Sequence, residues 1–203
     1  MRVDALAVPG AWLFTPRQFP DERGLFLEWF KADVLADAIG APMPVLQANH
    51  SVSRRGVVRG IHFADVPPGQ AKYVYCPQGA LLDVIVDIRV GSPTFGRWTS
   101  VVLDDGERRA VFLSEGLGHA FVALSDSASL TYLCSTPYAP DREHTLSPLD
   151  GDLAIDWGVQ EPIMSERDTS APTLAEAQAS GLLPSYDTCQ QWYLEARGFT
   201  DSR

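Results

Sequence analysis

Histidine is the side chain best suited to moving protons near neutral pH, and this sequence contains four of them. His62 lies in the run Val57-Val58-Arg59-Gly60-Ile61-His62-Phe63, whose apolar and β-branched residues predict a strand. Arg59 and His62 are three residues apart, so a regular strand would place them on opposite faces. A bulge at Gly60 would bring this cation and this base to the same face.

His119 lies in the run Glu115-Gly116-Leu117-Gly118-His119, where glycines let the backbone come close to a ligand. A histidine in a strand is more often a core residue bonded to a neighbour than a catalyst, and we assign that role to His50 and His144. A protein metal site of this kind needs several convergent histidine and carboxylate ligands. His62 and His119 are too few, and no His-x-His pair exists, so the sequence predicts no metal.

Lys72 is one of only two lysines and lies in the apolar, aromatic run Ala71-Lys72-Tyr73-Val74-Tyr75-Cys76. A lysine that points inward from such a strand needs an anionic partner. A lysine that points outward at the strand end needs none. The sequence alone leaves both orientations open.

Asp168 belongs to Ser165-Glu166-Arg167-Asp168, which is typical of a turn or a helix cap unless folding brings the carboxylate to a histidine. Tyr132 lies within an apolar run, and Tyr138 follows it closely. Tyrosines in strands usually serve packing. Taken singly, none of these three residues indicates a reaction.

Short runs of strand-forming residues with turn signals between them occupy most of the chain, and this pattern is typical of an antiparallel sandwich or barrel. In residues 81–90 the even positions are apolar, whereas Asp83, Asp87 and Arg89 occupy odd ones, which predicts a strand with one buried face. The predicted strands are 11–15, 24–30, 45–52, 57–63, 71–76, 79–90, 97–104, 109–113, 119–124 and 128–136. Helices are predicted over 31–39, ending at Gly40, and over 173–180, ending at Gly181. We therefore expect an all-β jelly-roll β-sandwich barrel with a few short peripheral helices.

The chain has 203 residues, 45% of them apolar, and a formal net charge of −10. An acidic chain with no basic tail is a poor partner for duplex nucleic acid or an anionic membrane. Residues 54–72 nevertheless hold four bases against the single acid Asp65, a local charge of +3. This local positive charge would suit a small anionic ligand such as a phosphate, although charge alone favours ordinary surface charge as the explanation.

Three cysteines lie far apart, and none belongs to a Cys-x-x-Cys pair, so we expect reduced, structural thiols and a cytoplasmic protein. No stretch approaches the ~20 apolar residues of a membrane helix. Residues 1–10 are too short and mixed in composition for a signal peptide.

Taken together, the runs Arg59-Gly60-Ile61-His62-Phe63 and Gly69-Gln70-Ala71-Lys72-Tyr73-Val74 resemble the RGxHx…KxV block of the dTDP-4-dehydro-6-deoxysugar 3,5-epimerases. The similarity covers about residues 8–185 in the right order and spacing. Further matching segments are 21–26, 47–51, 87–98, 114–121, Tyr132, Tyr138 and 165–168. Residues 145–152 and 188–192 depart from the compact rhamnose-pathway pattern and look like the branch that serves antibiotic deoxysugars.

This resemblance implies a homodimeric cupin-type jelly roll that needs neither metal nor cofactor and takes a dTDP-linked 4-keto-6-deoxyhexose. We expect one domain over residues 1–203, with a C-terminal extension from about residue 171. By match to the family pattern, His62 is the base, Asp168 its dyad partner, Lys72 the enolate cation and Tyr132 the acid on the opposite sugar face. The implied binding residues are Arg59 and His119 for the diphosphate, Arg23 from the partner subunit, Gln47 and Asn49 for the nucleotide sugar, and Phe19, Phe26, Glu28 and Tyr138 on the nucleotide side.

These residue types suit epimerisation beside a ketone, which requires a base, an acid across the ring and a cation near the developing enolate. We expect an isomerase that epimerises carbon 3, with or without carbon 5, of dTDP-4-dehydro-6-deoxy-D-glucose in the biosynthesis of a secondary-metabolite sugar. The alternatives are a 3,4-ketoisomerase on the same substrate, a non-catalytic nucleotide-sugar binder and, more distantly, a metal-dependent cupin oxygenase.

Overall fold

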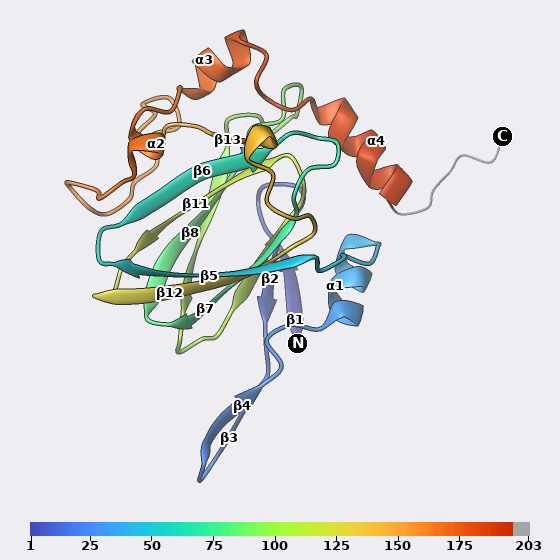
Figure 1. The fold of residues 1–203 in the computed structure, drawn as a ribbon. Helices are drawn as coiled ribbons and strands as arrows, with labels where there is room; N and C mark the ends of the chain where they lie inside the picture. The colour runs from blue at the N-terminus through green and yellow to red at the C-terminus, as the bar shows by residue number, and fades with distance from the viewer. Residues whose placement is uncertain (197–203) are drawn as a thin grey trace, which may run out of the picture.

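Two antiparallel sheets packed face to face form the body of the protein, of which the computed structural model describes residues 1–196 (Figure 1). In spatial order, the six-stranded sheet contains β1 (Arg2–Ala5), β2 (Ala11–Thr15), β10 (Ala110–Leu113), β7 (Lys72–Gln78), β12 (Ser127–Cys134) and β5 (Gln47–Arg54). The five-stranded sheet contains β13 (Glu143–Thr145), β6 (Val58–Ala64), β11 (Leu117–Ala123), β8 (Ala80–Asp87) and β9 (Trp98–Asp104). The predicted jelly-roll sandwich is confirmed.

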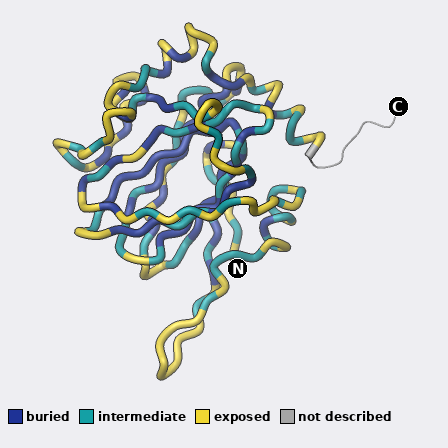
Figure 2. Tube along the Cα trace, in the orientation of Figure 1, coloured by how far each residue is buried: buried dark blue, intermediate teal, exposed yellow. Residues whose placement is uncertain are grey.

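A separate hairpin, β3 (Gln18–Asp21) and β4 (Gly24–Leu27), projects away from the sandwich and is exposed along its length (Figures 1 and 2). The prediction of a single strand over 24–30 was wrong at its far end. Trp29 and Phe30 leave the hairpin and pack on Tyr73 at ring-centroid distances of 6.1 and 5.1 Å. The short strands β1, β3 and β13 were missed because three or four residues carry too little alternation to be recognised.

Apolar side chains fill three layers around the two sheets. The interior cluster combines residues from both sheets, including Val74, Val111, Leu81 and Phe121. A second cluster covers the outer face of the five-stranded sheet with residues from the C-terminal third, such as Trp157. A third cluster lies on the outer face of the six-stranded sheet, where Leu35, Phe14 and Tyr73 are buried together. Every strand of the two main sheets except β1 therefore contributes at least one buried residue.

Strand β8 departs from its prediction, because both of its faces are buried. Its outer face packs under the second cluster through Val84 and Val86. Its inner face carries Asp83 and Asp87, which are 1% and 0% exposed. Burial of these carboxylates is tolerated because each has a cationic or hydrogen-bonding partner, Arg89 in the case of Asp87.

The helices are short and peripheral, as predicted. Helix α1 (Ala32–Ile39) ends at Gly40, whose φ of +80° is the left-handed cap conformation that favours glycine. Helix α3 (Leu174–Ala179) begins with a capping box between Thr173 and Glu176 and ends at Ser180, one residue before the predicted stop. The 3₁₀ turn η1 (Pro140–Arg142) and helices α2 (Glu166–Thr169) and α4 (Tyr186–Ala196) were not predicted.

No helix in residues 1–196 is long and apolar enough to cross a membrane. Cys76, Cys134 and Cys189 are free and buried, as expected of structural thiols. Burial raises the pKa of each thiol to about 11, so all three remain protonated at neutral pH. The last seven residues of the predicted domain, 197–203, lie outside the described residues.

Candidate active site

A bulge in β6 aligns two of the candidate residues, as the sequence analysis required. His62 lies opposite His119 and Arg59 lies opposite Phe121, so two residues of β6 face the single Ala120 of β11. Both Arg59 and His62 therefore share the inner face with Phe121, a residue of the interior cluster. Gly60 makes this possible, because it adopts a φ of +114° and a Cβ there would lie 2.7 Å from the Cβ of Ala120.

Asp168 meets His62 although 106 residues separate them. The His62 Nε2 and Asp168 Oδ1 atoms are 2.7 Å apart, and the aspartate is 3% exposed. The Ser165 hydroxyl caps helix α2 by accepting a hydrogen bond from the Asp168 amide, which fixes the carboxylate. Burial acts to raise the pKa of Asp168, but hydrogen bonds from His62, Ser165 and the Gly60 amide outweigh it and lower the pKa. The carboxylate is therefore ionised beside the imidazole.

Lys72 points inward, which decides the orientation that the sequence left open. It alternates with Tyr73 on β7 and shares a face with Val74 and Cys76, both in the interior cluster. Burial lowers the pKa of its ammonium, while the nearby Cys134, Glu143 and Asp83 act to raise it. Lys72 is half-buried, and within the described residues it has no ion pair at 4 Å or less, so its amino group faces the interior without a direct counter-ion.

Tyr132 lies on β12 beside this lysine. It is paired with Val74 across the sheet and packs against the interior cluster, and the Lys72 ammonium lies 6.0 Å from the centre of its ring. Burial raises the pKa of the phenol, and interaction with the Asn49 side chain opposes that rise. The phenol is therefore protonated at neutral pH and can act as a proton donor.

His119 contacts a second carboxylate, that of Asp83. Its Nε2 lies 2.7 Å from Asp83 Oδ2, and both residues are buried. The other oxygen, Asp83 Oδ1, is buried without a hydrogen-bond partner among the described residues. Asp83 is not recognisable as a site residue from sequence, because the alternation along β8 places it on a face expected to be exposed. In the register of β8 and β11, Asp83 is opposite Phe121 and two positions from the partner of His119, a diagonal contact that only the tertiary structure reveals.

Glu143 is the other residue that sequence reasoning missed. It lies on the three-residue strand β13 opposite Ala64, two positions from His62 and therefore on the same face. Its charge acts on both Lys72 and Tyr132. No sequence pattern marks so short a strand.

Gln47, Asn49 and Tyr138 are joined by hydrogen bonds at the end of β5. The Gln47 Nε2 donates to Asn49 Oδ1 at 2.9 Å, and Gln47 Oε1 accepts from the Tyr138 amide at 2.8 Å. The Tyr138 side chain itself is 54% exposed. These three predicted binding residues therefore adjoin Tyr132, which lies directly opposite Asn49.

Four predicted binding residues do not reach this site within one chain. Phe19, Arg23 and Phe26 lie on the β3–β4 hairpin that projects from the sandwich (Figure 1). The Arg23 side chain is 90% exposed and pairs with Asp21. Glu28 follows the hairpin and lies 3.9 Å from Lys31.

The predicted core roles of two histidines were wrong. His50 is exposed on the outer face of β5 and bonds to the Thr131 hydroxyl at 2.8 Å. His144 is half-buried and its Nε2 lies 2.7 Å from Asp65 Oδ1. Both are satisfied by polar neighbours at the sheet surface, and neither shares the inner face with His62.

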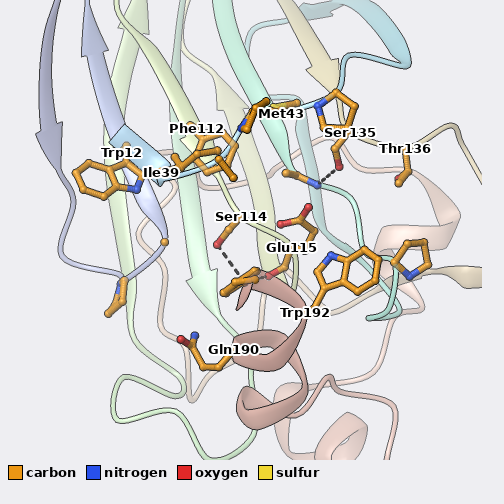
Figure 3. Close-up of a pocket in the computed structure, with 18 of the residues that line it drawn as sticks. Trp12, Ile39, Met43, Phe112, Ser114, Glu115, Ser135, Thr136, Gln190 and Trp192 are labelled. Carbon is orange, nitrogen blue, oxygen red and sulfur yellow. Dashed lines mark hydrogen bonds between the residues drawn. The ribbon is translucent and has the colours of Figure 1, made fainter. Parts of the chain in front are cut away.

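Within residues 1–196, no three His, Cys, Asp or Glu side chains are arranged to hold a metal ion. A cavity of about 300 Å³ lies elsewhere, on the outer side of the six-stranded sheet. Figure 3 shows it between Trp12, Met43 and Phe112 on one side and Gln190 and Trp192 of α4 on the other. No histidine and none of the charged groups around Lys72 lines this cavity, so it is separate from the cluster of His62, Lys72 and Tyr132 in the barrel interior.

His62, Lys72 and Tyr132 project from the two facing sheets of a jelly roll, and His62 is paired with the Asp168 carboxylate. This arrangement of side chains is suited to acid–base chemistry. Residues 5–176 match the model of the family described as dTDP-4-dehydrorhamnose 3,5-epimerase. The chain is 58% identical to a dTDP-4-dehydrorhamnose 3-epimerase of Streptomyces niveus over 94% of its own length and 92% of that protein. The chain therefore belongs to this epimerase family.

Two solved structures are similar in both sequence and fold. The rmlC epimerase of Mycobacterium tuberculosis superposes with a TM-score of 0.95 at 49% identity, covering 97% of this chain and 100% of that one. ChmJ, a 3'-monoepimerase from Streptomyces bikiniensis solved with dTDP-quinovose, gives a TM-score of 0.92 at 51% identity, covering 95% and 98% of the two chains. The similarity thus extends over nearly the whole sequence.

Proposed function

We propose that this protein epimerises carbon 3 of dTDP-4-dehydro-6-deoxy-D-glucose, with carbon 5 open to the same chemistry, in deoxysugar biosynthesis for a secondary metabolite. One observation carries the proposal. The base His62 projects inward from the five-stranded sheet, whereas the acid Tyr132 and the cation Lys72 project inward from the six-stranded sheet. A sugar ring between the sheets would have a base on one face and an acid on the other.

His62 removes the proton beside the ketone. The C–H electron pair moves into the ring to form an enolate, and the imidazole becomes an imidazolium. The Asp168 carboxylate, 2.7 Å from Nε2, stabilises that new charge and fixes the ring orientation. Because the 4-ketone acidifies carbons 3 and 5 alike, one base can serve both centres.

Lys72 stabilises the negative charge that develops on the ketone oxygen. Lys72 is half-buried and has no ion pair among the described residues, so the field of its ammonium group would be available to a substrate. In a site of reduced dielectric constant, such a preorganised cation acts more strongly than it would in water. Tyr132 then donates its phenolic proton to the carbon on the opposite face, and solvent restores both groups.

The remaining predicted residues bind the nucleotide. Arg59 and His119 would hold the diphosphate at the end of the same inner face, and Gln47, Asn49 and Tyr138 would contact the nucleotide sugar. We assign Phe19, Arg23, Phe26 and Glu28 to the site of a partner subunit, because the projecting hairpin leaves Arg23 and Phe26 exposed on its own chain. A homodimer with exchanged hairpins follows from this assignment.

Three further expectations remain part of the proposal. Relatives named as Streptomyces deoxysugar epimerases, one of them from the novobiocin cluster, support a role in antibiotic biosynthesis. Three free thiols suit the reducing cytoplasm. Residues 1–203 would form one domain whose extension, from about residue 171, returns to the barrel where Tyr186 stacks on Arg89 at 5.1 Å.

Relatives of similar identity carry both 3-epimerase and 3,5-epimerase names, so the number of centres must be measured. The protein is incubated with dTDP-4-dehydro-6-deoxy-D-glucose in deuterated water and the sugar is followed by proton NMR. Deuterium at carbons 3 and 5 identifies a double epimerase, and deuterium at carbon 3 alone identifies a mono-epimerase. His62→Ala should abolish exchange, and Tyr132→Phe should exchange the substrate proton while losing product. Absence of deuterium with the wild-type protein would refute the proposal and favour a nucleotide-sugar binder.

A further inference from the structure

Asn49 lies where it can control the proton donor directly. It is directly opposite Tyr132 in the register of β5 and β12, so the two side chains project side by side from the same face of the sheet. Paired residues on adjacent antiparallel strands have Cβ atoms about 4.5–5.5 Å apart. Asn49 is half-buried, and its side chain acts to lower the pKa of the Tyr132 phenol against the rise that burial causes.

The orientation of the Asn49 amide is set by its other neighbours. Its Oδ1 accepts a hydrogen bond from Gln47 Nε2 at 2.9 Å, so its NH₂ group must point the other way. That NH₂ group approaches Cys134 Sγ at 3.7 Å, on the same inner face as Tyr132. Gln47 is itself held, because its Oε1 accepts from the backbone amide of Tyr138. The amide therefore presents a donor, and not an acceptor, towards the phenol.

This polarity has a chemical consequence. A phenol oxygen that accepts a hydrogen bond from Asn49 keeps its own O–H free to point at the substrate. An enolate with a poorly directed donor is reprotonated by the His62 imidazolium on the face that it left, which returns substrate. The direction of the O–H thus sets the fraction of enolate that becomes product.

We propose that Asn49 is a positioning residue for Tyr132: its side-chain amide, held by Gln47, directs the phenolic proton at the substrate and so decides how much enolate is protonated on the face opposite His62. The inference rests on the epimerase function proposed above. It adds to Asn49 a role in partitioning the intermediate, separate from affinity for the nucleotide.

The test measures two rates in deuterated water at saturating substrate: deuterium entry into recovered substrate and formation of epimerised product. Because both begin from the same bound complex, their ratio does not depend on KM. Loss of one neutral hydrogen bond changes the ratio of two competing rates by roughly two- to twelvefold. Asn49→Ala should raise the ratio of exchange to product by about that factor. Asn49→Asp keeps the shape and the bond from Gln47 but offers the phenol an acceptor, so it should raise the ratio at least as much.

Two further variants distinguish a positioning role of Asn49 from a general structural effect on strand β5. Ser51→Ala alters the next inward position of β5, where the hydroxyl has no hydrogen-bond partner among the described residues, and should leave the ratio unchanged. Gln47→Ala frees the Asn49 amide without touching Tyr132 and should raise the ratio by a smaller factor. Thermal unfolding of each variant checks that the edge strand remains folded.

Several results would overturn the inference. If Asn49→Ala and Asn49→Asp raise KM but leave the ratio at the wild-type value, Asn49 is a nucleotide contact only. If Ser51→Ala raises the ratio as much as they do, the effect is a general loosening of β5. A wild-type protein that exchanges no proton would instead refute the epimerase function, which distinguishes that failure from failure of the positioning role.

Discussion

Replacing Asp168 by asparagine tests the charge relationship at the centre of the proposed mechanism. The substitution keeps the size of the side chain and removes one negative charge 2.7 Å from His62 Nε2. At that separation two unit charges attract by about 1.5 kcal/mol in water and by ~6 kcal/mol at an effective dielectric constant of 20. Net values for hydrogen bonds to charged groups are about 1.5–3 kcal/mol, which lies within these limits.

The Asp168 carboxylate provides this stabilisation only when His62 has taken the substrate proton, because the neutral imidazole carries no charge to stabilise. Losing about 1.5–3 kcal/mol from the transition state slows the reaction by roughly 10- to 160-fold. Asp168→Asn should therefore reduce deuterium entry and product formation in parallel, by this factor. Tyr132→Phe differs, because it should reduce product formation alone.

The assay is proton NMR in deuterated water, at saturating substrate, with each rate measured from the same sample. Asp65→Asn is the matched control, since Asp65 makes an equally short 2.7 Å contact with His144 on the outer side of the sheet. It should leave both rates within about twofold of the wild type, as expected of a surface substitution. If Asp168→Asn also keeps both rates within about twofold, no proton accumulates on His62 and the reasoning fails.

Three other predictions concern the supports of the site. Lys72→Ala should lower kcat by about 10²–10³-fold with little change in KM, because the cation acts on charge that develops in the transition state; a change in KM alone would make Lys72 a phosphate ligand. Gly60→Ala should destabilise the protein by more than about 2 kcal/mol in urea unfolding, since the methyl group would meet the β11 backbone, whereas Gly151→Ala, with nothing within 4 Å, should cost less than about 0.5 kcal/mol. Burial opposes ionisation of Asp87, but hydrogen bonds outweigh it and lower its pKa below 3.8, so its stabilising contribution is present above that pH and is lost as the pH falls through the lowered value. The unfolding free energies of Asp87→Asn and wild type should thus differ by about 3–5 kcal/mol at neutral pH, because Arg89 loses its partner, and converge in acid; a constant difference would contradict this.

Sequence patterns located the inner strands well because their side chains report burial directly. The run 71–76 is almost continuously apolar and the run 128–136 is largely apolar, and both became central strands, β7 and β12. The sequence indicated that a bulge at Gly60 would let Arg59 and His62 share a face, and the register of β6 and β11 contains that bulge. Gly40 ended α1 as expected, since glycine adopts the cap conformation without strain.

The same patterns failed where charged side chains point into the protein interior. Alternation along β8 implied an exposed acidic face, yet Asp83 and Asp87 point into the protein, where His119 and Arg89 lie 2.7 and 2.8 Å from them. The orientation of Lys72 was undetermined for the same reason, because a charged residue at a strand end fits either face. Short strands such as β13, which carries Glu143, left no pattern to recognise.

The sequence by itself determined the strand order along the chain, the residue types available for acid–base chemistry and, through its motifs, the family. Only the tertiary structure decided which of those residues meet. His62 joins Asp168 across 106 residues, and Asn49 faces Tyr132 across 83, because a jelly roll pairs strands that are remote in sequence. Contacts of that kind depend on the register and packing of whole sheets, and no local pattern along the chain encodes them.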